Sequence, residues 1–281
     1  MNKRAIVTGA SRGIGRGIAL ALAAEGYDLA ISYATQRNEA EAVAARIKSD
    51  YGRQCFIYRA SLNEHGEGKK LFDAAVTDLG GLDLLVNNAG ATIFQELQDM
   101  TEDTLDFMID LDFRNYLLMM SYAARYMIER GTRGCIINIT STRGEQAYPA
   151  DGIYGGLKAG LNRAIKSFAL DVSSYGIRIN NVAPGAIRIR TNEELLASGR
   201  VEMGAFWDEL GHRIPLGRSG LPEDIGNMVA FLASDKASYV TGLTVRVDGG
   251  LILPGMPELI TKDLRPGEWR SVINVTKENR L

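Results

Sequence analysis

Hydrophobic and polar positions alternate in blocks along the chain. Short apolar runs bounded by glycine, asparagine or charged residues are typical of strands that are buried on both faces of a sheet. We expect such strands at residues 4–8, 28–33, 54–58, 81–86, 135–139, 177–182 and 243–247.

Longer segments with helical spacing of apolar residues separate these runs. We expect helices after the first glycine-rich turn up to residue 24, at 38–50, up to 79, at 101–130, around Tyr154 and at 222–234. The 101–130 segment is predicted as one long helix, because Thr-Glu-Asp at its start suits a helix N-terminus. Repeated strand–helix units imply an α/β fold: a Rossmann-type, doubly wound parallel sheet in a single domain, with its ligand at the carboxyl ends of the strands.

Length and charge narrow the class of protein. A chain of 281 residues can bury a substantial core as one domain, and its formal net charge of −2 leaves no basic footprint for nucleic acid or an anionic membrane. Cys55 and Cys135 lie in expected strands, which favours buried free thiols over a disulfide. A strand begins at once and no apolar run could span a bilayer, so we predict a soluble cytoplasmic protein without a membrane partner. No metal site is predicted.

The first strand runs into a glycine-rich turn. Its sequence is Thr8-Gly9-Ala10-Ser11-Arg12-Gly13-Ile14-Gly15, followed by an alanine-rich helix. These glycines let the backbone turn tightly and approach a ligand, and the helix N-terminus presents free amides to a phosphate. The spacing differs from the Gly-x-Gly-x-x-Gly fingerprint, yet strand, turn and helix together predict a nucleotide site.

A second group of polar residues follows the strand at 135–139. Ser141 belongs to the hydroxyl cluster that follows this strand, and Tyr154 and Lys158 are one helical turn apart on one helix face. The lysine ammonium favours the phenolate form of the tyrosine, so the pair could exchange a proton with an alcohol or ketone while the serine hydroxyl holds the substrate oxygen. Taken alone, Tyr-x-x-x-Lys is also common as an ordinary surface pair.

Together these motifs resemble a short-chain dehydrogenase/reductase, from about Lys3 to Leu251. The matching motifs occur in order and at family spacing: the glycine-rich turn, Asn87-Asn88-Ala89-Gly90, Ser141 with Tyr154-x-x-x-Lys158, Pro184-Gly185 and Val247-Asp248-Gly249-Gly250. The resemblance implies that Tyr154 is the general acid/base and Ser141 the orienting hydroxyl. It also implies that Lys158 assists Tyr154 and binds the nicotinamide ribose.

The resemblance further implies a set of cofactor-binding positions. They are Gly9, Ser11, Arg12, Gly13, Ile14, Gly15, Tyr33, Arg37, Ser61, Asn88, Ala89, Gly90, Tyr154, Lys158, Pro184, Gly185 and Ile187. The end of the second strand, at Tyr33, carries no carboxylate to bind ribose hydroxyls, and Arg12 and Arg37 could meet a 2′-phosphate. NADP(H) is therefore favoured, with NAD(H) possible. Ser61 stands where the family usually has an aspartate near the adenine.

One catalytic position departs from the family pattern. Asp112 stands where the family usually has an asparagine, and Asn115 fits the spacing less well. A buried carboxylate at Asp112 would change the proton relay and could pair directly with Lys158. The alternative is that Asp112 is a surface residue of a long helix.

The substrate stays open between a 3-oxoacyl-carrier-protein reductase and a sugar or polyol dehydrogenase. The polar residues Arg143, Glu145, Gln146 and Tyr148 would suit a hydroxylated substrate if they faced it. By resemblance, residues 188–217, with Trp207 in a short helix, form the lid of a domain that spans 1–251, and 252–281 is a C-terminal extension. A non-catalytic NADP-binding redox sensor is the alternative function.

Glycines in the Tyr154 helix suggest the close approach of a backbone or of the cofactor. They are Gly155, Gly156 and Gly160, each of which costs up to about 1 kcal/mol against alanine. With the family likeness, they point to a homotetramer whose interface uses this helix and the 101–130 helix.

Overall fold

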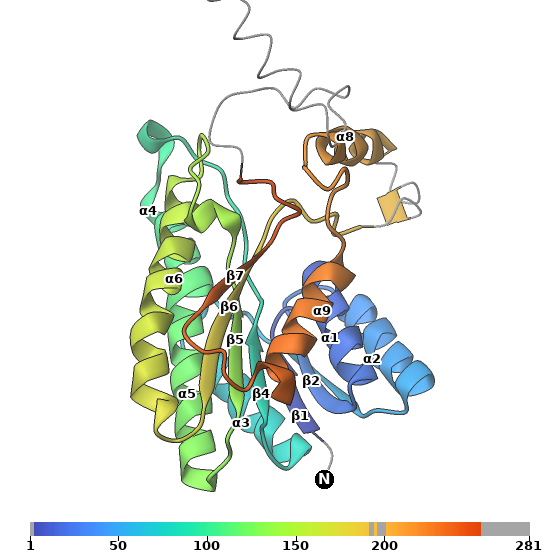
Figure 1. Ribbon diagram of the computed structural model, residues 1–281, viewed down its shortest axis with the longest axis vertical. Helices are drawn as coiled ribbons and strands as arrows, with labels where there is room; N and C mark the ends of the chain where they lie inside the picture. The colour runs from blue at the N-terminus through green and yellow to red at the C-terminus, as the bar shows by residue number, and fades with distance from the viewer. Residues whose placement is uncertain (1–2, 191–193, 196–200, 254–281) are drawn as a thin grey trace, which may run out of the picture.

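A parallel sheet forms the centre of the protein. The computed structural model describes residues 3–190, 194–195 and 201–253, without side chains for 201–203. Its seven strands follow the order β3-β2-β1-β4-β5-β6-β7 (Figure 1). They are β1 Lys3–Val7, β2 Tyr27–Tyr33, β3 Cys55–Arg59, β4 Leu84–Asn87, β5 Cys135–Ile139, β6 Arg178–Pro184 and β7 Thr244–Val247. The order reverses between β1 and β4, which places a crevice at their carboxyl ends.

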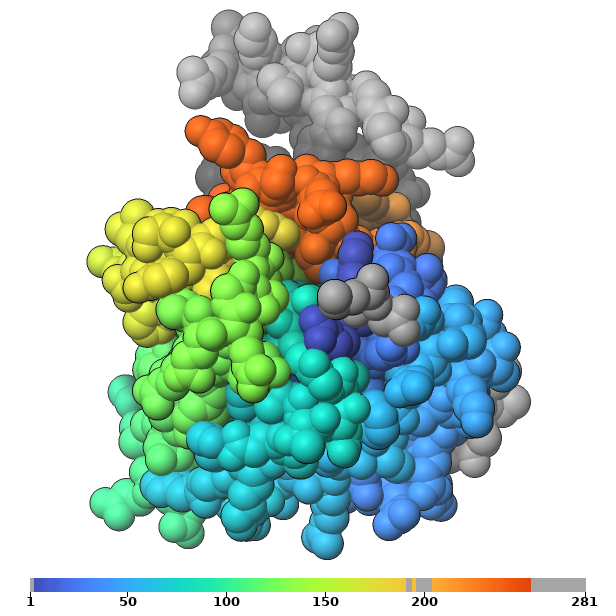
Figure 2. Space-filling view, turned by 90° about the horizontal axis from the view of Figure 1, so that it is seen from below, coloured from blue at the N-terminus to red at the C-terminus, as the bar shows by residue number. Residues whose placement is uncertain are grey.

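Helices cover both faces of the sheet. One face packs against α1 (Gly13–Ala24), α2 (Arg37–Tyr51) and α9 (Pro222–Ala233), and the other against α3 (Glu67–Leu79), α5 (Asn115–Arg130) and α6 (Gly152–Ser173). Helix α4 (Glu102–Ile109) precedes α5, and α8 (Val201–His212) lies beyond the carboxyl ends of the strands in Figure 1. The space-filling view shows the blue N-terminal segments and the green-to-yellow middle of the chain on opposite sides of the molecule (Figure 2).

The strands are apolar throughout because both of their faces are buried. In β1, Ala5 and Val7 pack with α1 and α9, whereas Ile6 packs on the opposite side with α5 and α6. A parallel sheet that is covered on both faces has this near-continuous apolar composition. The predicted Rossmann-type α/β fold is confirmed.

A ladder of buried amides crosses the sheet from β4 to β6. Asn87, Asn138 and Asn181 are register partners on neighbouring strands. The Nδ2 of Asn87 donates to Asn138 Oδ1 at 2.9 Å, Asn138 Nδ2 donates to Asn181 Oδ1 at 2.9 Å, and Asn181 Nδ2 donates to Asn162 Oδ1 of α6 at 3.1 Å. Each amide therefore fixes its neighbour just below the carboxyl ends of the strands.

The expected long helix over 101–130 is interrupted. Thr101 caps its start as expected, accepting a hydrogen bond from the Thr104 amide at 3.3 Å. However, α4 ends at Ile109, and a π-helical turn at Asp110–Arg114 precedes α5. A π turn widens the helix and changes the direction of the following side chains, which here brings Asp112 into the protein interior.

Other boundaries differ by a few residues. β4 begins at Leu84, because Gly80 and Gly81 adopt positive φ angles before it, and β6 continues to Pro184. Trp207 lies in the helix α8, as expected for the 188–217 segment. Residues 191–193 and 196–200 of that segment, and 254–281 of the extension, lie outside the described residues, so the division at 251 stays a prediction.

Both cysteines are free. Cys135 is buried in β5 and Cys55 is half-buried in β3. Burial raises the pKa of the Cys55 thiol to about 12 and that of Cys135 to about 11. Both thiols are therefore protonated and unreactive at neutral pH.

Candidate active site

One large cavity follows the carboxyl ends of the strands. Its volume is about 820 Å³. It is lined by most of the predicted site residues: Gly9, Ser11, Arg12, Gly13, Ile14, Gly15, Tyr33, Ser61, Asn88, Ala89, Gly90, Asp112, Ser141, Tyr154, Lys158, Pro184 and Gly185. The fold thus brings together motifs that are far apart in the sequence.

The glycine-rich turn is held tightly against the loop after β4. Gly9 has a φ of +64°, and a Cβ atom there would lie 2.8 Å from the Cα of Ala89. Asn88 Nδ2 donates to the carbonyls of Thr8 and Gly9, both at 2.9 Å, and Thr8 Oγ1 accepts from the Asn88 amide at 2.9 Å. Only glycine meets both the steric and the conformational demand at position 9.

The start of α1 fits a phosphate group. The helix begins at Gly13 without a capping side chain and without an acidic residue in its first turn. Its first amides therefore lie next to the cavity without a side-chain acceptor, and the helix dipole favours an anion there. This end of the cavity suits the pyrophosphate of a dinucleotide.

The end of β2 carries no carboxylate into the cavity. The lining here comes from residues 33–36, and Arg12 reaches the same region from the turn after β1. Arg12 also lines an adjoining cavity of about 380 Å³, with Arg16, Arg46, Arg190, Glu39 and Glu194 around it. Cationic groups outnumber carboxylates around that cavity.

Two predicted cofactor residues do not line the main cavity. Arg37 is exposed, and its guanidinium pairs with Glu41 at 2.8 Å along α2. Ile187 is buried and forms an isolated β-bridge with Gly220. Their proposed contacts to a cofactor stay predictions.

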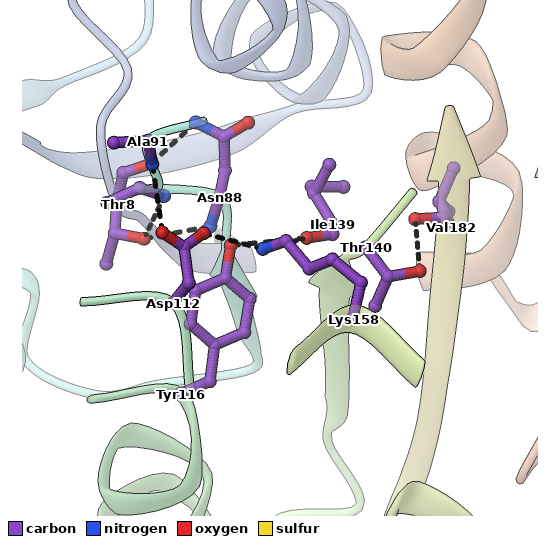
Figure 3. A network of polar contacts seen from close by, with 10 residues as sticks. Thr8, Asn88, Ala91, Asp112, Tyr116, Ile139, Thr140, Lys158 and Val182 are labelled. Carbon is purple, nitrogen blue, oxygen red and sulfur yellow. Dashed lines mark hydrogen bonds and ion pairs between the residues drawn. The ribbon is translucent and has the colours of Figure 1, made fainter. Parts of the chain in front are cut away.

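Asp112 and Lys158 form an ion pair inside the protein. Asp112 Oδ1 lies 2.9 Å from Lys158 Nζ, and the two side chains are 0% and 2% exposed (Figure 3). The other carboxylate oxygen accepts a hydrogen bond from the Ala91 amide at 3.0 Å. A Cβ atom on Gly90 would lie 2.5 Å from Asp112 Oδ1, so this position has room only for glycine.

Asp112 is therefore not a surface residue. Of the two alternatives that the sequence left open, the structure shows the direct pair with Lys158. Both of its oxygens accept hydrogen bonds from donors. An asparagine would turn its own NH₂ group towards one of these two donors. These surroundings favour aspartate over asparagine at this position.

The Lys158 ammonium is strongly retained. Burial by itself lowers the pKa of Lys158, but its electrostatic interactions with Tyr116, Asp112 and Tyr154 and the hydrogen bond to Asp112 outweigh it, so the pKa is raised. Lys158 Nζ also lies 5.4 Å from the ring centroid of Tyr154, one turn before it on α6. The cation is thus fixed beside the candidate acid/base.

The Ser141 hydroxyl is already oriented by the backbone. Its Oγ accepts a hydrogen bond from the Arg143 amide at 3.1 Å, at the start of a short 3-10 turn over Thr142–Gly144. Because that bond uses an oxygen lone pair, the hydroxyl proton stays available for a substrate oxygen. Ser141 and Tyr154 line the same cavity.

Gly155 and Gly160 allow close packing within the chain. A Cβ atom on Gly155 would lie 2.8 Å from the Arg143 carbonyl, and one on Gly160 would lie 2.9 Å from the Phe113 ring. Gly156 has open space around it. The close approach expected from the glycines is thus partly explained by the loop after β5 and by the π turn.

The polar loop after Ser141 is occupied with internal contacts. Arg143 pairs with Asp151 at 2.9 Å, and its guanidinium lies 4.4 Å and 5.0 Å from the ring centroids of Tyr148 and Phe94. Glu145 pairs with Arg246 at 2.9 Å. Within the part of the chain that the structure describes, Arg143, Glu145, Gln146 and Tyr148 do not line the main cavity.

Sequence reasoning missed several residues around the cavity. Thr92, Phe107 and Leu111 line it, and the ring of Tyr116 contacts the Lys158 ammonium. Leu111 directly precedes Asp112 and Tyr116 follows it by four residues, but the direction of both side chains depends on the π turn. A hydrophobic pattern does not reveal such a turn.

The comparisons with known proteins agree with this geometry. The family model for enoyl-(acyl carrier protein) reductase matches residues 9–252. The chain belongs to the short-chain dehydrogenase/reductase family.

The similarity to individual members of this family extends over almost the whole length of those proteins. The 3-oxoacyl-acyl-carrier-protein reductase FabG of Staphylococcus epidermidis is 41% identical over 253 residues, which cover 90% of this chain and 100% of that protein. A short-chain dehydrogenase/reductase of Armillaria gallica is 35% identical, over 88% of this chain and 95% of that protein.

Solved structures of the family show the same fold. Acetoin dehydrogenase from Enterobacter cloacae has a TM-score of 0.83 at 32% identity, covering 95% of this chain and 99% of its own. Acetoin dehydrogenase YohF from Salmonella typhimurium has a TM-score of 0.81 at 33% identity, covering 90% of this chain and 98% of its own. The chain is thus an oxidoreductase of an NAD(P)-dependent family.

The described residues contain neither a membrane-spanning helix nor a cluster of metal ligands. No helix among them is long and apolar enough to cross a membrane. No group of three or more His, Cys, Asp and Glu among them could hold a metal ion.

The buried pair leads to a stability prediction. We expect Asp112→Asn to lower the free energy of unfolding by about 3–5 kcal/mol, because it leaves a buried ammonium without its counter-charge. The raised Lys158 pKa makes this contribution fully present below the ordinary lysine pKa of 10.5, and it is lost as the pH rises through the folded-state value. Urea unfolding at pH 7 measures the difference.

Asp110→Asn is the matched control. Asp110 lies in the same π turn, but it is partly exposed and pairs with His65 at 3.3 Å. We expect this substitution to change stability by no more than about 0.5 kcal/mol. Equal stability of the Asp112 and Asp110 variants would contradict the assigned role of the buried pair.

Proposed function

We propose that the protein is an NADP(H)-dependent oxidoreductase that moves a hydride between the nicotinamide and a ketone or secondary alcohol, with Tyr154 as general acid/base. The observation that carries this proposal is the joint placement of Ser141, Tyr154 and Lys158 in one cavity, with Lys158 anchored by Asp112. A bound nicotinamide supplies the hydride in reduction and accepts it in oxidation.

The residues of the chain would then divide the remaining work. Ser141 donates a hydrogen bond to the substrate oxygen and keeps its proton, and Tyr154 transfers its proton to that oxygen as the alcohol forms. The Lys158 ammonium stabilises the negative charge left on the tyrosine oxygen. In the oxidative direction Tyr154 takes the proton back from the alcohol.

We propose that the substrate carries an apolar chain next to its carbonyl group. The polar loop after Ser141 is engaged in its own ion pairs. The loop after β4 instead exposes Phe94, Leu97 and Met100, beginning two residues beyond the cavity-lining Thr92. These observations favour a 3-oxoacyl-type substrate, as in the name of the FabG relative, over a sugar or polyol.

Tyr154→Phe tests the mechanism. We expect the rate of carbonyl reduction to fall by about 10²–10⁴-fold, because the general acid is lost, while NADPH still binds. The measurement is NADPH oxidation with 3-oxoacyl thioesters, acetoin and keto-sugars as separate substrates. Unchanged turnover in the variant would refute the role of Tyr154, and NADPH binding without turnover by the wild-type protein would favour the redox-sensor alternative.

The cofactor preference rests on Arg12. We expect NADPH to bind more tightly than NADH, and Arg12→Ala to weaken NADPH binding by about 10–100-fold, since a hydrogen bond to a charged group contributes about 1.5–3 kcal/mol. Nicotinamide fluorescence titration measures both.

Arg37→Ala is a useful comparison for Arg12. We expect a smaller loss of NADPH affinity, because its guanidinium is exposed and is already paired with Glu41. Tighter binding of NADH than of NADPH by the wild-type protein would contradict the proposed preference.

We also propose a cytoplasmic homotetramer that uses α5 and α6. An apolar groove of about 520 Å³ between these helices is lined by Leu117, Met120, Ala124, Ile128, Phe168 and Val172, among others. Phe168 of α6 lines this groove and is only half-buried. An apolar groove with a partly exposed phenylalanine suits contact with a second copy.

Light scattering after size-exclusion chromatography tests this assembly. We expect four times the chain mass of 30.6 kDa for the wild-type protein and a smaller particle for Phe168→Asp, which places a charge in the groove. Leu97→Asp, at an exposed leucine of the loop after β4, should leave the mass unchanged. A monomeric wild-type protein would contradict the proposed interface.

A further inference from the structure

Tyr116 is a fully buried polar side chain beside the candidate active site. It lies on α5, one helical turn after Asp112, and its side chain is 0% exposed. Residues at this spacing lie on the same side of a helix. Figure 3 shows its hydroxyl next to the Lys158 ammonium.

Tyr116 and Lys158 share one acceptor. The Tyr116 hydroxyl donates to the carbonyl of Ile139 at 3.2 Å, and Lys158 Nζ approaches the same oxygen at 3.5 Å. This carbonyl is at the last residue of β5, two residues before Ser141. The tyrosine therefore joins the lysine to the strand that carries the candidate serine.

The ring of Tyr116 also contacts the ammonium. Lys158 Nζ lies 4.6 Å from the centroid of the ring. A cation over an aromatic face in a buried site gains electrostatic attraction without water to screen it. Asp112, Ile139 and Tyr116 thus confine the amine on the side that faces the protein, whereas Lys158 also borders the cavity.

Tyr116 itself is held at both ends. Its hydroxyl is bound to Ile139, and its backbone carbonyl accepts a hydrogen bond from Asn87 Nδ2 of β4 at 3.4 Å. Burial raises the pKa of the phenol, an effect that the nearby Lys158 only partly offsets. The group therefore stays neutral and keeps its proton for the Ile139 carbonyl.

We propose that Tyr116 is a positioning residue that acts through Lys158. Its hydroxyl and ring fix the ammonium at the distance from Ser141 and Tyr154 that the reaction and the nicotinamide ribose require. This inference rests on the proposed function, in which Lys158 contacts the cofactor and supports Tyr154.

Tyr116→Phe isolates the hydroxyl, because the ring and its packing remain. Without the hydroxyl, Lys158 loses one of its fixed neighbours and its pKa falls. We expect kcat to drop about tenfold with little change in the KM for the carbonyl substrate, and NADPH to bind several-fold more weakly. The alkaline limb of the kcat profile should move to lower pH, because the ammonium is less firmly retained.

Tyr27→Phe is the matched control. Tyr27 is also a buried tyrosine whose hydroxyl donates to a backbone carbonyl, that of Ala233 at 3.5 Å, but it packs with the α1 and α9 layer. We expect its kcat, pH profile and NADPH affinity to equal those of the wild-type protein. Thermal unfolding of both variants separates a general loss of stability from the local effect.

The outcomes distinguish this inference from the proposed function. Weaker NADPH binding in Tyr116→Phe but not in Tyr27→Phe supports it, even if the wild-type protein turns over no carbonyl and the proposed reaction fails. Wild-type kcat, pH profile and NADPH affinity in Tyr116→Phe overturn it, even if the reaction itself is confirmed. Equal losses in both variants also overturn it.

Discussion

A buried lysine ammonium needs its counter-charge, and much of the candidate site is arranged around this constraint. Removing such a cation from water costs several kcal/mol, which only a close anion with further hydrogen bonds offsets. Asp112 meets this need for Lys158, and the Ala91 amide in turn holds Asp112. Gly90 leaves the space that the carboxylate occupies. The glycine after β4, the π turn and the helix α6 are therefore linked through one pair of charges.

The sequence predicts the fold well because the sheet is buried on both faces. Apolar runs mark every strand, and β5 coincides with its predicted range at 135–139. The largest difference is the 101–130 segment, which is two helices joined by a π turn. Helical periodicity is averaged over many residues, so one widened turn leaves no trace in the pattern. That turn nevertheless decides where Asp112 lies.

The sequence predicts where the candidate site lies in the fold, but not which contacts its individual side chains make. The motifs predict that Ser141, Tyr154 and Lys158 lie close together, since they follow the carboxyl ends of strands, and all three line one cavity. The partners of individual side chains could not be predicted, because they come from distant segments. Arg143 is a case in point: besides Asp151 of its own loop it contacts Phe94 from the loop after β4, and it does not line the main cavity.

The amide ladder has a direction. Asn87, Asn138 and Asn181 all donate towards α6, and the Asn87 oxygen at the start of the row has no hydrogen-bond partner among the described residues. Reversing the central amide of Asn138 would oppose donor to donor towards Asn87 and acceptor to acceptor towards Asn181. The row can therefore change only as a unit. Replacing all three asparagines together by apolar residues would leave none of these three amides unpaired. Replacing only one would leave a neighbouring amide in the core of the sheet without its hydrogen-bond partner.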